Sequence, residues 1–161
     1  GMRPDDERIP DSFEIARKMG LSYSFGIANL TSAHPNSVVL EVKGKSGRTL
    51  EVQACSLGGG RIMINRLDGL DVNCSCEIPT LIVHNLDQPG HVAEVTSMLA
   101  HKSVNIANMS LYRDKRGGSA VMVVEMDQPL PKESLEWLEH REGIVKVTYI
   151  NVTEGEEDDV L

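Results

Sequence analysis

The chain has 161 residues, 40% of them hydrophobic, and a formal net charge of −8. This composition predicts a folded protein with a hydrophobic core, and the acidic balance argues against nucleic acid or an anionic membrane as a partner. No stretch is long and apolar enough to cross a bilayer, and the three cysteines are too few for a disulfide framework. We therefore expect a cytoplasmic protein that binds neither nucleic acid nor membrane.

The first half of the chain predicts a small, β-rich α+β unit. A short helix is expected after Asp11 or Ser12, either of which can cap it, and Gly20 can end it. Apolar and polar residues then alternate over residues 21–27, which is typical of a strand with one apolar face. Further strands are expected at residues 38–42, 49–54 and 61–66, with turns at 33–36, 43–48 and 67–71.

The second half predicts a more regular alternation of strands and helices. The expected elements are a strand at 80–85, a helix at 89–102, strands at 105–113 and 119–127, a helix at 132–140 and a strand at 145–152. Residues 114–118 have the composition of a hairpin turn between the two middle strands. The order β-α-β-β-α-β is the ferredoxin-like arrangement, in which four antiparallel strands carry both helices on one face.

These patterns divide the chain into three parts. The first domain is expected to span residues 11–76 and the second residues 78–152, with residues 72–78 as the best linker between them. Residues 153–161 are dominated by Asp and Glu, which repel one another, so we expect an acidic disordered tail.

The loop Asn85-Leu86-Asp87-Gln88-Pro89-Gly90 is the sharpest candidate for a binding site. Backbone N–H groups at the start of the following helix can hold a carboxylate, while Asp87 and an Asn side chain can hold an α-amino group. Gly90 would let a ligand approach the backbone closely. Equally, Asp87 could merely cap the helix and Gly90 merely ease a tight turn. Asn105 opens the next strand; we expect it to return to the same end of the sheet as the loop, or to be an ordinary turn residue.

Three other features carry weaker signals. The glycine run 58–60 is not followed by Gly-Lys-Ser/Thr or by a helix, so it does not predict a phosphate-binding loop, although a turn close to another chain or to a small anion remains open. Cys74 and Cys76 are too few for a structural metal site, which favours thiols in the core or on the surface. His34 and Asn36, in a turn, are candidate catalytic residues, although such a histidine is more often an ordinary surface residue.

Two sets of motifs resemble known families. The segments Asp87-Gln88-Pro89-Gly90 and Val104-Asn105-Ile106, within a β-α-β-β-α-β order, resemble the ACT domain, a regulatory module that binds amino acids. Upstream, the segments His34-Pro35-Asn36, Ser56-Leu57-Gly58-Gly59-Gly60 and Leu67-Asp68-Gly69 resemble the β chain of iron–sulfur L-serine dehydratase. That enzyme converts L-serine to pyruvate and ammonia, so the resemblance implies a role in serine breakdown.

The resemblance also implies how the work is divided between chains. The first domain is similar to the allosteric substrate-binding domain of some D-3-phosphoglycerate dehydrogenases. The 4Fe–4S cluster of the family is held by a separate α chain or domain, so this chain would assist catalysis without holding the metal. Nothing here matches the Gly-Pro-Ser-Ser-Ser-His-Thr-like segment with which the β chain usually begins, so we expect a first domain truncated at its N-terminus and a chain that is not catalytic alone.

For the ACT domain, the resemblance implies an amino-acid effector such as serine. The effector-binding positions fall on Asn85, Asp87, Gly90 and Asn105, with Asn85 where a histidine is usual and Asp87 where an asparagine is usual. Such sites generally form between two ACT domains, which implies a side-by-side homodimer. Two alternatives stay open: a non-enzymatic amino-acid sensor, and the regulatory tail of a D-3-phosphoglycerate dehydrogenase, although no nucleotide-binding fingerprint precedes it.

Overall fold

The computed structural model describes residues 2, 6–31 and 33–151, and the predicted acidic tail at 153–161 lies outside the described residues. The chain divides into a small N-terminal unit within residues 1–31 and a main unit of residues 32–153.

The N-terminal unit is one short helix followed by an extended segment. A 3-10 turn, η1 (Ile9–Asp11), leads into α1 (Ser12–Lys18), which confirms the predicted helix. The predicted strand at residues 21–27 was wrong, because these residues form no strand and Phe25 and Ile27 are 80% and 106% exposed. An alternating pattern favours a strand only where another strand supplies hydrogen bonds, and the ring of Phe25 instead packs against Phe13.

The first part of the main unit is a four-stranded antiparallel meander. Its strands are β1 (Ser37–Lys43), β2 (Thr49–Gly58), β3 (Arg61–Leu67) and β4 (Leu70–Cys74), arranged in sequence order. The glycine run 58–60 turns the chain from β2 into β3, and φ is positive at all three positions, which explains why glycines stand there. The predicted linker was wrong in its first half, because Val72 and Cys74 belong to β4 and are buried.

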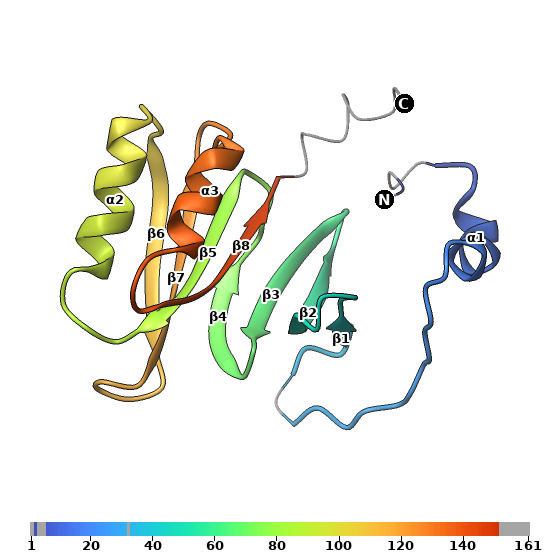
Figure 1. The fold of residues 1–161 in the computed structure, drawn as a ribbon. Helices are drawn as coiled ribbons and strands as arrows, with labels where there is room; N and C mark the ends of the chain where they lie inside the picture. Colours follow the sequence, from blue (N-terminus) through green and yellow to red (C-terminus); the bar gives the residue numbers. More distant parts are fainter. Residues whose placement is uncertain (1, 3–5, 32, 152–161) are drawn as a thin grey trace. The chain divides into compact units, whose positions relative to one another are not determined.

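The second part has the expected ferredoxin-like α+β fold. Its elements are β5 (Thr80–Leu86), α2 (His91–His101), β6 (Ile106–Arg113), β7 (Ser119–Met126), α3 (Lys132–Glu139) and β8 (Ile144–Ile150). The strands lie in the order β6-β7-β5-β8, with every neighbouring pair antiparallel. Figure 1 shows both helices alongside this sheet. In this order β6 and β8 are the edge strands.

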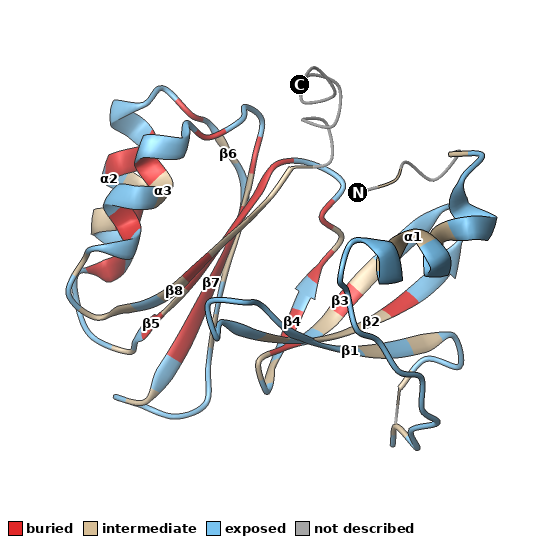
Figure 2. Cartoon of the chain, turned by 45° about the vertical axis from the view of Figure 1, so that its right-hand side comes forward, coloured by how far each residue is buried: buried red, intermediate tan, exposed pale blue. Residues whose placement is uncertain are grey.

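Both faces of the second sheet are covered, which explains the near-continuous apolar runs of β5 and β7 (Figure 2). On one face, Leu81 and Val83 of β5 pack with Leu99 of α2 and Leu138 of α3, and all four side chains are fully buried. On the other face, Ile82 joins a second cluster made with the first sheet. Strand residues alternate in direction, so one strand contributes to both cores.

No helix in the described part of the chain is long and apolar enough to cross a membrane.

Candidate effector site and the junction between the sheets

Asp87 follows β5 and is tied to the hairpin between β6 and β7. Its Oδ2 accepts a hydrogen bond from the Gly117 amide at 2.9 Å and lies 3.1 Å from Nη1 of Arg113. The Gly117 amide, together with the charge of Arg113, holds the pKa of Asp87 below its ordinary value despite some desolvation. The carboxylate is therefore ionised at neutral pH, and it braces the loop instead of capping α2.

The N-terminus of α2 carries no side-chain cap. Gly90 is the N-cap residue, with φ of 107°, and a side chain added there would meet nothing within 4 Å. The helix therefore begins without a side-chain acceptor for its first amides and with open space beside Gly90, an arrangement that suits an anionic group.

Two buried polar atoms near this loop have no hydrogen-bond partner among the described residues. They are Oδ1 of Asn85 and Nε2 of His91, and the two residues are 4% and 9% exposed. Both residues lie beside the start of β8: Asn85 pairs with Ile144, and the His91 ring lies 2.5 Å from the position of a Cβ on Gly143. Buried polar atoms are rarely left unpaired, so both mark this end of the sheet as polar and ready for a further partner.

Asn105 lies at the other end of the sheet, contrary to the prediction that it returns to the loop. Its backbone oxygen accepts from the Asp127 amide at 3.1 Å, beside the start of β5, whereas Asp87 lies at the end of β5. The error came from the direction of β6: β7 is antiparallel to both β5 and β6, so β5 and β6 run parallel and begin at the same end. Asn105 Nδ2 donates to Asp127 Oδ2 at 2.6 Å.

A polar cluster joins the two sheets on the opposite face from the helices. Asp68, in the turn between β3 and β4, places Oδ2 2.5 Å from Nζ of Lys146 on β8 and 3.5 Å from Nε2 of His84 on β5. Its Oδ1 accepts from the Glu51 amide at 2.9 Å. Burial alone would raise the pKa of Asp68, but these hydrogen bonds and the positive charge of Lys146 lower it below its ordinary value.

The surroundings of His84 favour its neutral form. Burial lowers its pKa, and the charges of Lys146 and Arg48 lower it further, against the opposing effect of Asp68. A hollow of about 320 Å³ next to this cluster is lined by Asp68, His84 and Asn85 among others. The end of β5 that carries the candidate effector loop therefore also contacts the first sheet.

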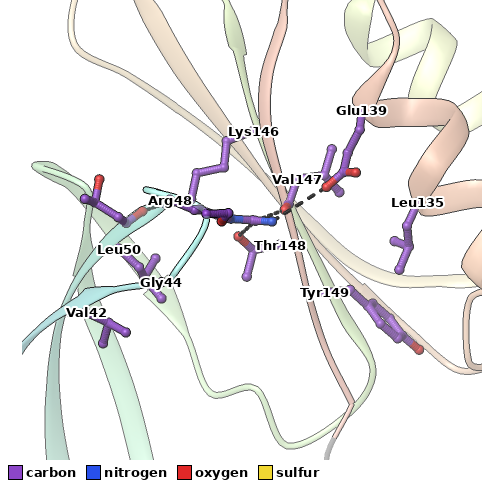
Figure 3. A pocket seen from close by; sticks show the side chains of 12 residues that line it. Val42, Gly44, Arg48, Leu50, Leu135, Glu139, Lys146, Val147, Thr148 and Tyr149 are labelled. Atoms are coloured by element: carbon purple, nitrogen blue, oxygen red, sulfur yellow. Dashed lines mark hydrogen bonds and ion pairs between the residues drawn. The ribbon is translucent and has the colours of Figure 1, made fainter. Parts of the chain in front are cut away.

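A cleft of about 520 Å³ opens between the β1–β2 hairpin and β8 with α3 (Figure 3). Arg48 reaches across it from the hairpin, donating to the backbone oxygen of Val147 and, at 3.1 Å, to Oγ1 of Thr148. Its guanidinium also lies 3.6 Å from Glu139 of α3. The cleft is therefore part of the junction between the sheets, and the charge of Arg48 in it already has a partner in Glu139.

His34 and Asn36 lie in the turn before β1. The backbone amide of Asn36 donates to Nδ1 of His34 at 3.2 Å, and the backbone oxygen of Asn36 accepts from the Ser56 backbone amide on β2 at 2.9 Å. These contacts fasten the turn to the first sheet. Neither residue lies near the β5–α2 loop in the register of the strands.

The cysteines do not fit an iron–sulfur cluster. Cys74 and Cys76 contact each other, with their sulfurs 3.0 Å apart, which leaves no room for iron between them. Among the described residues, no group of three or more His, Cys, Asp or Glu side chains is arranged to hold a metal ion.

The sequence interpretation missed Arg113, Gly117 and His91 at the loop, and Lys146 at the junction. The predicted strand order could have identified the first two, since the end of β6 and the hairpin after it meet the end of β5 in this topology. His91 follows Gly90 directly, at the first position of the helix. No local pattern marks Lys146, which acts on Asp68 across 78 residues of sequence.

Comparison with known proteins supports both halves of the fold. The family model described as "ACT domain" matches residues 79–139, the part of the chain with the ferredoxin-like fold. The "Probable L-serine dehydratase, beta chain" of Bacillus subtilis is 32% identical over 145 residues, which is 90% of this chain and 66% of the relative. The "L-serine dehydratase, beta chain" of Peptoniphilus asaccharolyticus is 34% identical over 131 residues, or 81% of this chain and 59% of the relative. The chain is therefore similar to L-serine dehydratase β chains over most of its own length.

A more distant likeness involves a different enzyme. The "D-3-phosphoglycerate dehydrogenase" of Methanocaldococcus jannaschii is 31% identical over 90 residues, which is 56% of this chain and only 17% of that protein. The chain spans 59–66% of the length of the two β chains that it matches.

Proposed function

We propose that the chain is the regulatory and accessory β portion of an L-serine dehydratase, whose ACT domain binds an amino-acid effector such as serine. The observation that carries the proposal is the match to β chains, which runs over 90% of this chain and so includes both sheets. The 4Fe–4S cluster and the dehydration step belong to an α-chain partner, in keeping with cysteines that do not fit a cluster here. The chain alone is not catalytic.

The effector site is proposed at the β5–α2 loop. The amides of α2 beyond Gly90 would receive the ligand carboxylate, and Asp87 with Oδ1 of Asn85 would receive its ammonium group. Asn85 supports this assignment, because its buried oxygen has no donor among the described residues. Serine carries both the carboxylate and the ammonium group that these partners would bind, as do other amino acids.

Asn105 enters the site from a second copy. β6 is an edge strand, whose outward N–H and C=O groups favour pairing with another strand. If two copies pair through β6 about a two-fold axis, the strands run antiparallel and the start of each meets the end of the other. Asn105 of one chain then approaches Arg113 and Asp87 of its partner. A side-by-side homodimer is therefore part of the proposal.

Calorimetry with a panel of amino acids, serine included, tests the site. We expect saturable binding of an amino acid to the native protein and an affinity at least about tenfold lower in Asp87→Ala and in Asn105→Ala. Asn108→Ala, which removes a matched amide on β6, should leave the affinity nearly unchanged. If no amino acid binds a protein shown by sedimentation to be dimeric, the effector site is wrong.

Mixing the two defective variants tests the dimer. In a heterodimer of Asp87→Ala with Asn105→Ala, a site shared between copies leaves one of the two sites intact. An equal mixture that exchanges freely should recover about a quarter of the native binding stoichiometry. No recovery after demonstrated exchange would place both residues outside a shared site.

The D-3-phosphoglycerate dehydrogenase likeness supports a second candidate, the regulatory tail of such an enzyme. Co-expression separates the two. We expect a cluster-bearing dehydratase α chain to co-purify with this chain and to deaminate serine; co-purification with a nicotinamide-dependent dehydrogenase instead would favour the alternative. A chain that binds amino acids and joins neither would be a stand-alone sensor.

A further inference from the structure

Two cysteine thiols meet at the point where the first sheet ends and the chain crosses to the ACT domain. Cys74 is the last residue of β4, and Cys76 lies in the connector that leads to β5. Their sulfurs are 3.0 Å apart, and the residues are 2% and 6% exposed. Both belong to the hydrophobic cluster between the two sheets.

The backbone brings these sulfurs together by leaving the extended conformation. In a strand, residues i and i+2 point to the same side about 6.6 Å apart along the chain, which is too far for contact between their sulfurs. Here φ of Cys76 is 54°, a left-handed conformation that residues other than glycine adopt rarely. Ser75, between them, places its hydroxyl 3.5 Å from the carboxylate of Glu125. The turn is thus built around the thiol pair.

The surroundings give the two thiols different characters. A hydrogen bond from Cys76 lowers the pKa of Cys74, against burial and the negative charge of Glu125, which raise it. The same hydrogen bond, together with burial, raises the pKa of Cys76. One sulfur is therefore the better nucleophile, and the other stays protonated beside it, as in a pair prepared for exchange.

We propose that Cys74 and Cys76 form a reversible thiol–disulfide switch that responds to peroxides. The Cys74 thiolate attacks one oxygen of hydrogen peroxide, which gives a sulfenic acid and, after protonation, water. The Cys76 sulfur then attacks the Cys74 sulfur; its proton and the departing hydroxide form a second water as the S–S bond closes. Two thiols lose two electrons in total, and one peroxide gains them.

The position of the pair decides which oxidants can act and what closure does. Cys76 is followed in the connector by the exposed residues Glu77 and Ile78, so a local opening of the connector would admit a molecule as small as peroxide to the buried thiols. A disulfide would fix the turn at the start of the connector to the end of β4. The inference does not depend on which ligand the ACT domain binds.

Cysteine mapping in the 161-residue chain tests the switch. The reduced protein, freed of reductant, is treated with equimolar hydrogen peroxide, denatured, alkylated and digested with trypsin. The sequence places Cys74 and Cys76 together in the fragment 67–102 and Cys55 in the fragment 49–61. We expect the fragment 67–102 to resist alkylation and to be lighter by two hydrogens, while Cys55 is alkylated. A dithiol added before denaturation should restore both thiols.

Variants separate this pair from ordinary oxidation. Cys55, buried like the pair, is the matched control, so Cys55→Ser should close the same disulfide. In Cys74→Ser, Cys76 should stay open to alkylation. The proposal is overturned if Cys74 and Cys76 of the native protein remain as alkylatable as Cys55, if they gain oxygen without closing, or if peroxide links separate chains. Mapping of the native protein decides the proposal by itself, so the test does not depend on whether each variant folds.

Discussion

Replacing Asp68 by asparagine tests whether charge holds the two sheets of the main unit together. The carboxylate lies 2.5 Å from Lys146, and the two side chains are 24% and 15% exposed. Asparagine keeps an oxygen for the Glu51 amide and tolerates the φ of 46° at this turn. The substitution therefore removes the charge and little else, leaving Lys146 without its anion.

The magnitude follows from the degree of burial. Loss of one member of an exposed ion pair costs about 0–1 kcal/mol, whereas loss of one member of a fully buried pair costs about 3–5 kcal/mol. Asp68 and Lys146 lie between these limits, so we expect the free energy of unfolding to fall by about 1–3 kcal/mol. Urea unfolding at pH 7 measures this loss of stability. Asp71→Asn is the control: that carboxylate is 94% exposed and 3.8 Å from Arg66, so its loss should cost less than about 0.5 kcal/mol.

The pH dependence gives an independent check on the same pair. The pKa of Asp68 is lowered in the folded protein, so its contribution is present above its ordinary value of 3.8 and is lost as the pH falls through the folded pKa. The difference between the native protein and Asp68→Asn should therefore shrink toward zero in strong acid. The reasoning fails if Asp68→Asn unfolds at the same urea concentration as the Asp71→Asn control at pH 7.

Two further predictions concern the same unit. Gly143→Ala should lower the free energy of unfolding in urea by about 1–3 kcal/mol, because a Cβ would lie 2.5 Å from the His91 ring and φ is 77°. Gly47→Ala is the control for backbone strain alone, since φ there is 84° and an added Cβ meets nothing within 4 Å. If both variants lose the same stability, the clash with His91 contributes nothing. The pKa of His84 is lowered in the folded protein, so the free energy of unfolding should decrease as the pH falls below about 6.5 toward the folded pKa. His84→Gln should make the free energy of unfolding depend less on pH in this range. The same pH dependence in the variant and in the native protein between pH 7 and 5 would contradict the lowered pKa of His84.

The ACT half of the fold could be predicted almost element by element, because each element there has a clear local cause. Pro89 and Gly90 mark the start of a helix whose apolar residues recur at helical spacing, and residues 114–118 mark a hairpin. The apolar residues of β5 and β7 meet partners on both faces, in the helices and in the first sheet. Residues 21–27 show the limit of the same method, since their alternation is as regular but no strand within the described residues pairs with them.

The site was predicted less well, because it depends on which end of the sheet each residue occupies. Asn85, Asp87 and Gly90 are neighbours in sequence and stay neighbours in space. The position of Asn105 depends on whether β6 runs parallel or antiparallel to β5, and the alternating pattern of a strand does not indicate this. Lys146 required knowledge of which sheet faces β8, which local sequence does not contain.

The corrected position of Asn105 changes the meaning of the β5–α2 loop. Within one chain the loop offers a helix N-terminus, a braced carboxylate and an unsatisfied amide oxygen, but no amide at 105. The same β5 strand places His84, three residues before Asp87, 3.5 Å from Asp68 of the first sheet. A ligand that draws the end of β5 toward a second copy therefore acts on a strand that also contacts the first sheet. β5 is therefore the strand through which the candidate effector loop and the first sheet are joined within one chain.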